Sequence, residues 1–198
     1  MAQFRRKCQR VDKNHLVFID GTGIRAEPRK LRALAPRGNT PRVTATRHEK
    51  YEPRVDMWGA IAYSGPLACE TFTSQQRKNV IKTRSGKKGV KGYTKPMVKN
   101  FLKKKLAPKI KKLKGKPILC MDKGLHFKEE EVKEAIEDGG ATNLHDVWIF
   151  PTNTAKFVSP LDNTLWHGLK ERVRARKPDT DSTARVMKRV HGYSPNGN

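Results

Sequence analysis

Two aspartates in this sequence each directly follow a short apolar run. Asp20 comes after residues 15–19 (HLVFI), and Asp122 comes after residues 117–121 (PILCM). Apolar runs of this length with polar or turn-forming neighbours predict buried strands. In α/β sheets, functional groups gather at the carboxyl ends of strands. The two carboxylates are therefore expected to lie close together if their strands are neighbours.

A third aspartate, Asp162, begins a segment with the periodicity of a helix, whose inner face carries Leu165, Leu169 and Val173. Packed against the sheet, this helix would bring its carboxylate to the other two. Three carboxylates in one place repel each other unless a divalent cation neutralises them, and their oxygens suit Mg²⁺ or Mn²⁺. Two such ions, roughly 4 Å apart, can activate a water or a 3′-hydroxyl beside a phosphodiester and stabilise the leaving oxygen.

Each aspartate also has a purely structural interpretation. Asp20 begins the sequence Asp-Gly-Thr-Gly and can be a turn former. Asp122 can be an ordinary polar residue at the end of a strand, and Asp162 can be the N-cap of its helix. Residue types and spacing alone leave both interpretations open.

The charge of the chain indicates a polyanionic partner. The 198 residues carry 43 Lys and Arg against 19 Asp and Glu, a formal net charge of +24. Lys and Arg displace condensed counterions from phosphates, which favours nucleic acid over a membrane surface, for which no amphipathic anchor is found. No apolar run approaches the length of a transmembrane segment. The basic residues 1–10 are compatible with a nuclear address in a eukaryote; otherwise a cytoplasmic location is expected.

Much of the positive charge lies in residues 77–116, which hold 17 Lys and Arg, and no acid occurs from 71 to 121. Residues 84–92 are expected to form a loop. A helix is expected to follow, with Val98, Phe101, Leu102 and Leu106 on its apolar face, and to break or restart at Pro108. Charge runs usually form solvated faces, but the absence of acids favours a phosphate-facing surface. The lysines proposed to bind nucleic acid are Lys87, Lys88, Lys91, Lys95, Lys99, Lys103, Lys104, Lys105, Lys111 and Lys112.

The remaining patterns complete one α/β domain, a mixed sheet with helices packed on it. Its further elements are a hairpin around residues 64–66, an edge strand near 42–45, a helix at 129–138, a strand at 147–150 and the helix from Asp162. The predicted organisation is a basic N-terminal extension (1–14), the domain itself (15–176) and a polar C-terminal tail (177–198).

Several blocks, in order, resemble the DDE-type catalytic domain of the Tc1/mariner and IS630-like transposases, between about residues 15 and 174. The blocks are residues 16–20, 34–38, 55–61 with Gly65, 118–122 with His126, and 159–163 with Pro151 and the following Leu165, Trp166, Leu169 and Lys170. The resemblance implies an RNase H-like fold, Asp20, Asp122 and Asp162 as catalytic metal ligands, two Mg²⁺ or Mn²⁺ ions, and DNA cleavage and strand transfer. It also implies that His126 and Asn163 either lie behind the metal ligands or face the substrate.

The sequence departs from this family in three places. Lys123 stands where Asn usually follows the second acid. Counting back from Trp166, the family's third acid falls on Asn163, so Asp162 would serve after a shift of one residue. Only 19 residues precede Asp20, too few for the family's helix-turn-helix region. A catalytic domain without its site-recognition domain, a fragment or a derived protein is therefore expected.

Two functions remain after this comparison. The first is a Mg²⁺-dependent DNA endonuclease and transposase-like strand transferase. The second is a catalytically inactive, basic nucleic-acid-binding protein on the same fold, either a domesticated element or a ribonucleoprotein component. A phosphate loop of a sugar-kinase or actin-like ATPase at residues 18–23 is disfavoured, because that fold needs two such domains. DNA is the expected partner with RNA left open, as is a homodimer, and no membrane is expected.

Overall fold

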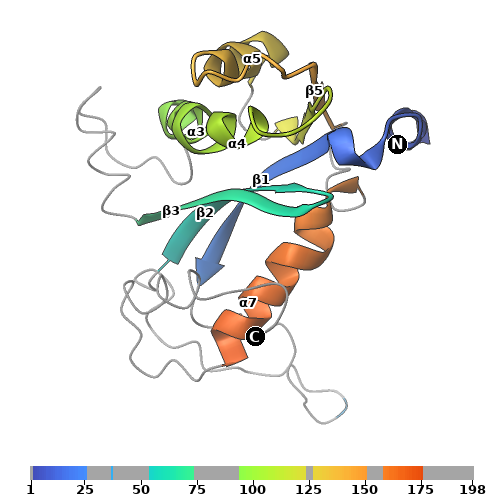
Figure 1. The fold of residues 1–198 in the computed structure, drawn as a ribbon. Helices are drawn as coiled ribbons and strands as arrows, with labels where there is room; N and C mark the ends of the chain where they lie inside the picture. The colour runs from blue at the N-terminus through green and yellow to red at the C-terminus, as the bar shows by residue number, and fades with distance from the viewer. Residues whose placement is uncertain are drawn as a thin grey trace.

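The computed structural model describes residues 2–25, 37, 54–73, 94–123, 127–150 and 158–175, which build one mixed sheet with helices on both faces (Figure 1). The strand order is β3-β2-β1-β4-β5. The strands are β1 (Leu16–Arg25), β2 (Arg54–Ala62), β3 (Gly65–Thr73), β4 (Ile118–Met121) and β5 (Asp146–Ile149). β2 is antiparallel to both β1 and β3, whereas β4 runs parallel to β1 and β5 runs parallel to β4.

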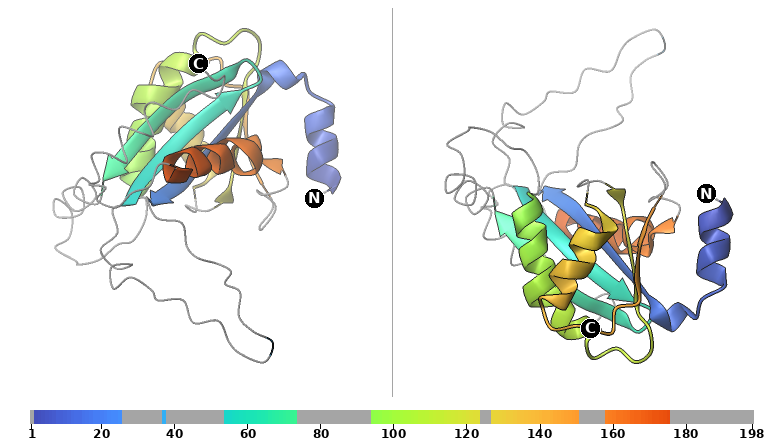
Figure 2. Two further views of the ribbon diagram at one scale, coloured as in Figure 1. Left: turned by 90° about the horizontal axis from the view of Figure 1, so that it is seen from below. Right: turned by 90° about the horizontal axis from the view of Figure 1, so that it is seen from above.

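The helices lie on both faces of this sheet (Figures 1 and 2). They are α1 (Ala2–Gln9), the 3₁₀ turn η1 (Lys13–His15), α3 (Lys95–Phe101), the π-helix η2 (Leu102–Leu106), α4 (Ala107–Ile110), α5 (Glu129–Glu137), the π-helix η4 (Leu161–Leu165) and α7 (Trp166–Ala175). Among the described helices, none is long and apolar enough to cross a membrane.

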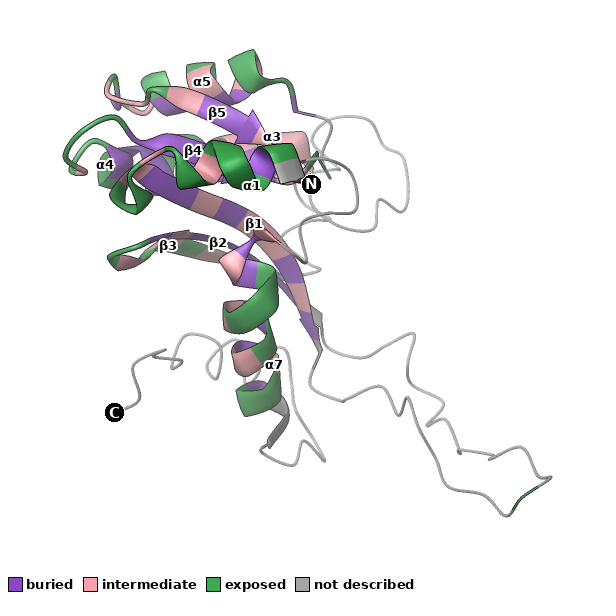
Figure 3. Cartoon of the chain, turned by 90° about the vertical axis from the view of Figure 1, so that its right-hand side faces the viewer, coloured by how far each residue is buried: buried purple, intermediate pink, exposed green. Residues whose placement is uncertain are grey.

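The largest core lies between the sheet and the helices α3, η2, α4 and α5. Alternate β1 residues, Val17 and Ile19, point into it and are fully buried. The apolar face predicted for the helix after residues 84–92 is confirmed in α3 and η2. Its residues Val98, Phe101, Leu102 and Leu106 are all buried against the sheet. Figure 3 shows the strands as mostly buried and the outer faces of the helices as exposed.

The opposite face of the sheet carries α7 and α1. Ile24, Val55 and Met57 pack against the buried Leu169 and Val173 of α7. Phe4 of α1 makes edge-on ring contacts with Trp148 and Phe150, with centroids 6.1 and 5.1 Å apart. The N-terminal residues therefore add a small core of their own to this face.

Most predicted elements are confirmed, including the mixed sheet, the hairpin of β2 and β3, and the helix α5 that ends before Gly139 and Gly140. The predicted turn at residues 20–23 is wrong: β1 continues to Arg25, because β2 pairs with it throughout. The helix predicted to break or restart at Pro108 does restart there: α3 ends at Phe101, η2 follows, and α4 begins at Ala107 with Pro108 in its first turn. The wider π-helical turn of η2 comes directly before and spares the clash that Pro108 would cause in a regular helix.

The predicted edge strand at 42–45, the loop at 84–92 and the tail at 177–198 lie outside the described residues.

Candidate active site

Asp20 lies inside β1 rather than after it, opposite Gly59 of β2. Side chains alternate along a strand, so Asp20 points to the same face as Phe18 and Ile24, which is the face covered by α7. Its carboxyl group is therefore placed beneath a helix and largely removed from water. An acid in such a place needs hydrogen bonds or a cation to stay ionised.

Trp166, at the start of α7, holds the carboxyl group of Asp20 in place. The indole Nε1 donates a hydrogen bond of 2.9 Å to Oδ2 of Asp20. The ring is 1% exposed, and it lies so close to Gly59 that a Cβ there would come within 2.6 Å of Cη2 of the tryptophan. Gly59 thus leaves the space that allows Trp166 to reach Asp20.

Asp162, in η4, lies beside Asp20. The pKa of Asp20 is raised to about 7, chiefly by burial and then by the negative charge of Asp162, while hydrogen bonds from Trp166 and the backbone of Gly21 oppose the rise. The two carboxyl groups are also hydrogen-bonded to each other. Asp162 is exposed and Asp20 is not, so burial favours the protonated form at Asp20.

Asp122 directly follows β4, as predicted, and is half-buried. Ile19 pairs with Met121 in the parallel register of β1 and β4, so one further step along both chains leads to Asp20 and Asp122. Neighbouring strands lie about 4.8 Å apart, which makes these two aspartates neighbours at the backbone level. The carboxylate of Asp122 accepts a hydrogen bond of 2.7 Å from the backbone N–H of Lys123.

The three aspartates fit a divalent cation in donor chemistry but are not gathered around one point. Within the described ranges, no group of three His, Cys, Asp or Glu side chains is arranged to hold a metal ion. The negative charge of Asp162 raises the pKa of Asp20, a repulsion that a cation between the two carboxylates would relieve. Carboxylate oxygens are the ligands that Mg²⁺ and Mn²⁺ prefer.

The alternative role of Asp162 as a helix N-cap is not what the structure has, because Pro160 occupies the N-cap position of η4. Asn163 is exposed in the same π-helix, and its backbone N–H donates to the carbonyl of Ser159 at 3.2 Å. Of the two neighbours, Asp162 is the one whose charge acts on Asp20. π-Helical turns of this kind occur often at functional sites. His126 lies outside the described residues.

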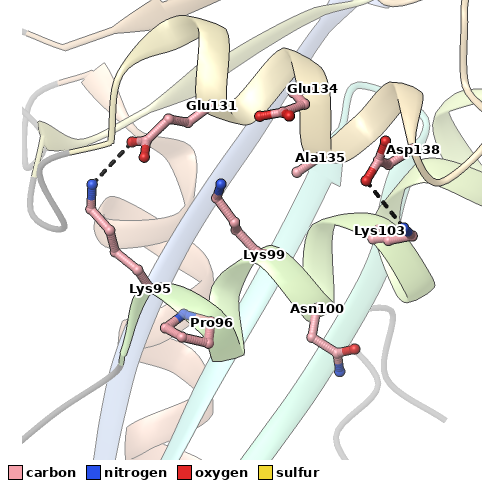
Figure 4. Close-up of a pocket in the computed structure, with 9 residues that line it drawn as sticks. All are labelled: Lys95, Pro96, Lys99, Asn100, Lys103, Glu131, Glu134, Ala135 and Asp138. Atoms are coloured by element: carbon pink, nitrogen blue, oxygen red, sulfur yellow. Dashed lines mark hydrogen bonds and ion pairs between the residues drawn. The ribbon is translucent and has the colours of Figure 1, made fainter. Parts of the chain in front are cut away.

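The predicted nucleic-acid-binding lysines fall into different surroundings. Lys95 and Lys103 face α5 across a groove of about 520 Å³ between α3 and α5 (Figure 4). Lys95 forms an ion pair of 3.0 Å with Glu131, and Lys103 forms one of 3.1 Å with Asp138. These acids are distant in sequence, which is why charge counting along residues 71–121 did not reveal them. Two of the ten lysines are therefore paired with carboxylates.

The other described lysines of that set stay near the surface. Lys99 also lines the groove, and its side chain points toward α5 in Figure 4. Lys104 and Lys105 are exposed and lie near Glu70, whose pKa is raised by burial in spite of these two positive charges. Lys111 and Lys112 are exposed after the end of α4. Lys87, Lys88 and Lys91 lie outside the described residues.

Sequence reasoning missed the roles of Trp166 and Gly59 at this site. A pairing of Asp20 with Gly59 is a property of the sheet register, which no local pattern reveals. Asp56 is also fully buried in β2, but it pairs with Gly23 and shares the face of Trp58 and Ala60, away from Asp20.

No protein-family model matches this chain, and no curated protein matches its sequence. Among solved structures, the chain is similar to the Mos1 transposase paired-end complex with left transposon end, with a TM-score of 0.60 at 14% identity over 96% of this chain and 51% of that chain. The fold is RNase H-like, shared with this transposase. The Mos1 strand transfer complex is also similar, with a TM-score of 0.53 at 12% identity over 96% and 54% of the two chains. The chain thus spans about half the length of these transposase chains.

Proposed function

We propose that this chain is a Tc1/mariner-type domain that binds DNA and breaks and joins its phosphodiester bonds. The observation that carries the proposal is the contact of Asp20 with Asp162 on a fold shared with Mos1 transposase, with Asp122 directly after the neighbouring parallel strand β4. The solved relatives are a complex with a transposon end and a strand transfer complex, which makes DNA the partner proposed for this chain.

Asp20, Asp122 and Asp162 are the proposed ligands of two Mg²⁺ or Mn²⁺ ions. When bound, these ions activate the attacking oxygen and stabilise the leaving oxygen of the phosphodiester. Asp20 must give up its proton to take part, and its pKa of about 7 allows this near neutral pH. Trp166 keeps one carboxylate oxygen of Asp20 in a fixed orientation, because its indole N–H donates to Oδ2. The burial of Asp20 beneath α7 keeps water away from this carboxylate.

The test is nicking of supercoiled plasmid DNA by the full 198-residue chain in buffers with Mg²⁺, Mn²⁺ or EDTA. We expect nicking that requires the metal and falls at least 100-fold in Asp20→Ala and in Asp122→Ala. Glu137→Ala is the matched control, because Glu137 is an exposed acid on α5, away from the proposed site. Unchanged nicking in either aspartate variant would contradict the assignment.

The second candidate is a DNA-binding protein without catalytic activity on the same fold. Two observations favour it: the described carboxylates do not converge on one point, and Lys123 follows Asp122. This function predicts that binding weakens steeply with salt and is unaffected by loss of all three aspartates, and that no metal-dependent nicking occurs.

A further inference from the structure

Lysines gather at the end of the sheet where β1 and β4 begin, which is opposite to the end with the aspartates. Residues 111–117 connect α4 to the start of β4, whereas Asp122 comes after its end. The parallel strand β1 begins at the same edge, preceded by Lys13 and His15 in η1. We name the exposed lysines Lys13, Lys111, Lys112, Lys114 and Lys116 the lysine edge.

The lysine edge has a fixed backbone. Asn143 Nδ2 donates hydrogen bonds of 3.0 and 3.1 Å to the carbonyl oxygens of Ile110 and Leu113. Gly115 has a φ of +84° and packs directly on His15, where a Cβ would come within 2.3 Å of Nε2. The backbone N–H of His145 donates to the carbonyl of Pro117 at 2.8 Å. Such a surface loses little backbone entropy when a ligand binds.

Positive charge on this edge is not neutralised within the part of the chain that the structure describes. Lys95, Lys103 and Lys133 form ion pairs with described acids, but Lys111, Lys112, Lys114 and Lys116 form none. Two acids at this edge, Asp12 and Asp146, have other partners. Asp12 accepts from the backbone and the side chain of Asn14, both at 2.9 Å. Asp146 accepts from Lys133 at 3.0 Å and from Trp148 at 2.7 Å.

The chemistry of the edge fits phosphates rather than bases. Tyr63 is the only large hydrophobic side chain that is exposed among the described residues, with 63% of its surface accessible. Lys13 lies over the ring of Tyr63, with Nζ 4.0 Å from the ring centroid and 2.8 Å from the hydroxyl oxygen. The ring is therefore not open for stacking on an unpaired base, which single-strand binding requires. Five ammonium groups without a free aromatic platform suit the backbone of a double helix.

We propose that the lysine edge is a second binding surface, independent of the aspartates, that contacts the phosphate backbone of double-helical DNA without reading its sequence. The proposal does not require catalysis: a chain that fails to nick DNA can still bind through this edge.

The test compares two triple variants that lose the same charge. Lys111→Gln, Lys112→Gln and Lys114→Gln remove lysines of the edge, whereas Lys95→Gln, Lys103→Gln and Lys133→Gln remove lysines that are paired with acids. Both sets are placed in the Asp20→Ala and Asp122→Ala background, and binding to a fluorescent 30-base-pair duplex is measured in EDTA. Thermal unfolding of each variant checks that it is folded.

We expect the edge variant to bind about tenfold or more weakly at 0.1 M NaCl, and the slope of log Kd against log salt to fall by roughly 2 to 3. The ion-paired variant should change by less than threefold. Equal losses in the two variants, no loss in the edge variant, or edge-dependent binding of an RNA duplex with none of the DNA duplex would each overturn the proposal.

A second readout uses the unmodified chain and does not depend on the folding of any variant. Lysine amines are acetylated with and without the DNA duplex, and modification is quantified by mass spectrometry. Protection of Lys111, Lys112, Lys114 and Lys116 supports the surface. Full reactivity of these four amines under saturating DNA would overturn it.

Discussion

At the scale of single residues, the site depends on how Asp20 differs from the other two aspartates. Asp162 is exposed and Asp122 is half-buried, but Asp20 lies under α7 with Trp166 as its hydrogen-bond donor. Burial and the charge of Asp162 raise its pKa to about 7. An ionised Asp20 without a cation is thus costly to the folded chain, which is the usual cost of a buried functional acid.

The first prediction concerns the pH dependence of stability. The folded pKa of Asp20 is above the value of 3.8 for an unfolded chain, so the folded state binds a proton more tightly. The contribution of this tighter proton binding to the free energy of unfolding is fully present below pH 4. It is lost as pH rises through about 7, where Asp20 ionises in the folded chain. Asn imitates the protonated acid, so Asp20→Asn should match the wild type near pH 4 and be more stable at pH 8 by about 2 kcal/mol or more, within the roughly 4 kcal/mol that the full shift represents.

Chemical denaturation of both proteins in EDTA at several pH values measures this difference. Other titrating groups are common to both proteins and cancel in the comparison. Asp138→Asn is a control, since Asp138 is an exposed acid on the other face of the sheet. A constant stability difference between wild type and Asp20→Asn from pH 4 to pH 8 would show that Asp20 titrates normally.

The sequence predicted the three aspartates but not the environment that distinguishes them. Apolar runs before Asp20 and Asp122 are local signals, and a helical period after Asp162 is another. The contact of Trp166 with Asp20 joins residues 146 positions apart and depends on how α7 crosses the sheet. Local sequence patterns do not reveal contacts between residues so far apart in the chain. Neither the indole donor nor the raised pKa of Asp20 could therefore be predicted from them.

At the scale of elements, the sheet overrides local turn signals. Residues 20–23 have the composition of a turn, yet they pair with β2 in unbroken register from Asp20 opposite Gly59 to Gly23 opposite Asp56. Backbone hydrogen bonds to a neighbouring strand outweigh the weak intrinsic preference of glycine for conformations other than a strand. The hairpin of β2 and β3 was predicted because its strands and its turn are adjacent in sequence. The extension of β1 was not, because its partner lies about 35 residues away.

The second prediction concerns the contact between β2 and α7. A methyl group at position 59 would lie 2.6 Å from Cη2 and 3.3 Å from Cζ2 of Trp166, so the indole must move. We expect Gly59→Ala to lower the free energy of unfolding by about 1 to 3 kcal/mol, as other overpacked cores do. The moved indole should also lose its hydrogen bond to Asp20. Loss of that donor should raise the pKa of Asp20 further.

A double-mutant cycle with Trp166→Phe tests the cause of this effect. Phenylalanine keeps a buried ring but has no atom at the Cη2 position, so Gly59→Ala should cost much less in that background. Denaturant unfolding of the four proteins gives the coupling energy. An equal cost of Gly59→Ala in both backgrounds would mean that the close contact with Trp166 is not the cause.

At the scale of the whole molecule, charge is distributed by the fold and not only by the sequence. The basic residues 77–116 seem unbalanced along the chain, but α5 brings Glu131 and Asp138 against Lys95 and Lys103. Among the described lysines that form no ion pair with a described acid, Lys111, Lys112, Lys114 and Lys116 lie after α4, at the edge opposite the aspartates. The molecule therefore combines a carboxylate pair at one end of its sheet with positive charge at the other.

The third prediction uses this separation to distinguish an enzyme from an inactive DNA-binding protein. Replacing Asp20, Asp122 and Asp162 with Asn removes the negative charge of these carboxylates, which repels phosphates. In EDTA, the triple variant should bind a DNA duplex more tightly than the wild type, by roughly two- to fivefold, since each exposed charge contributes little in water.

Added Mg²⁺ should reduce or reverse this difference in DNA affinity between the triple variant and the wild type. Bound cations turn the carboxylates from a repulsive group into a bridge to the phosphates, and only the wild type can hold them. Fluorescence anisotropy with one duplex, at one ionic strength kept constant with NaCl, gives the four dissociation constants. We expect Mg²⁺ to shift the ratio of the two dissociation constants by about tenfold in favour of DNA binding by the wild type. The same ratio in EDTA and in Mg²⁺ would mean that the aspartates hold no cation at the DNA, and the inactive binding protein would be the better account.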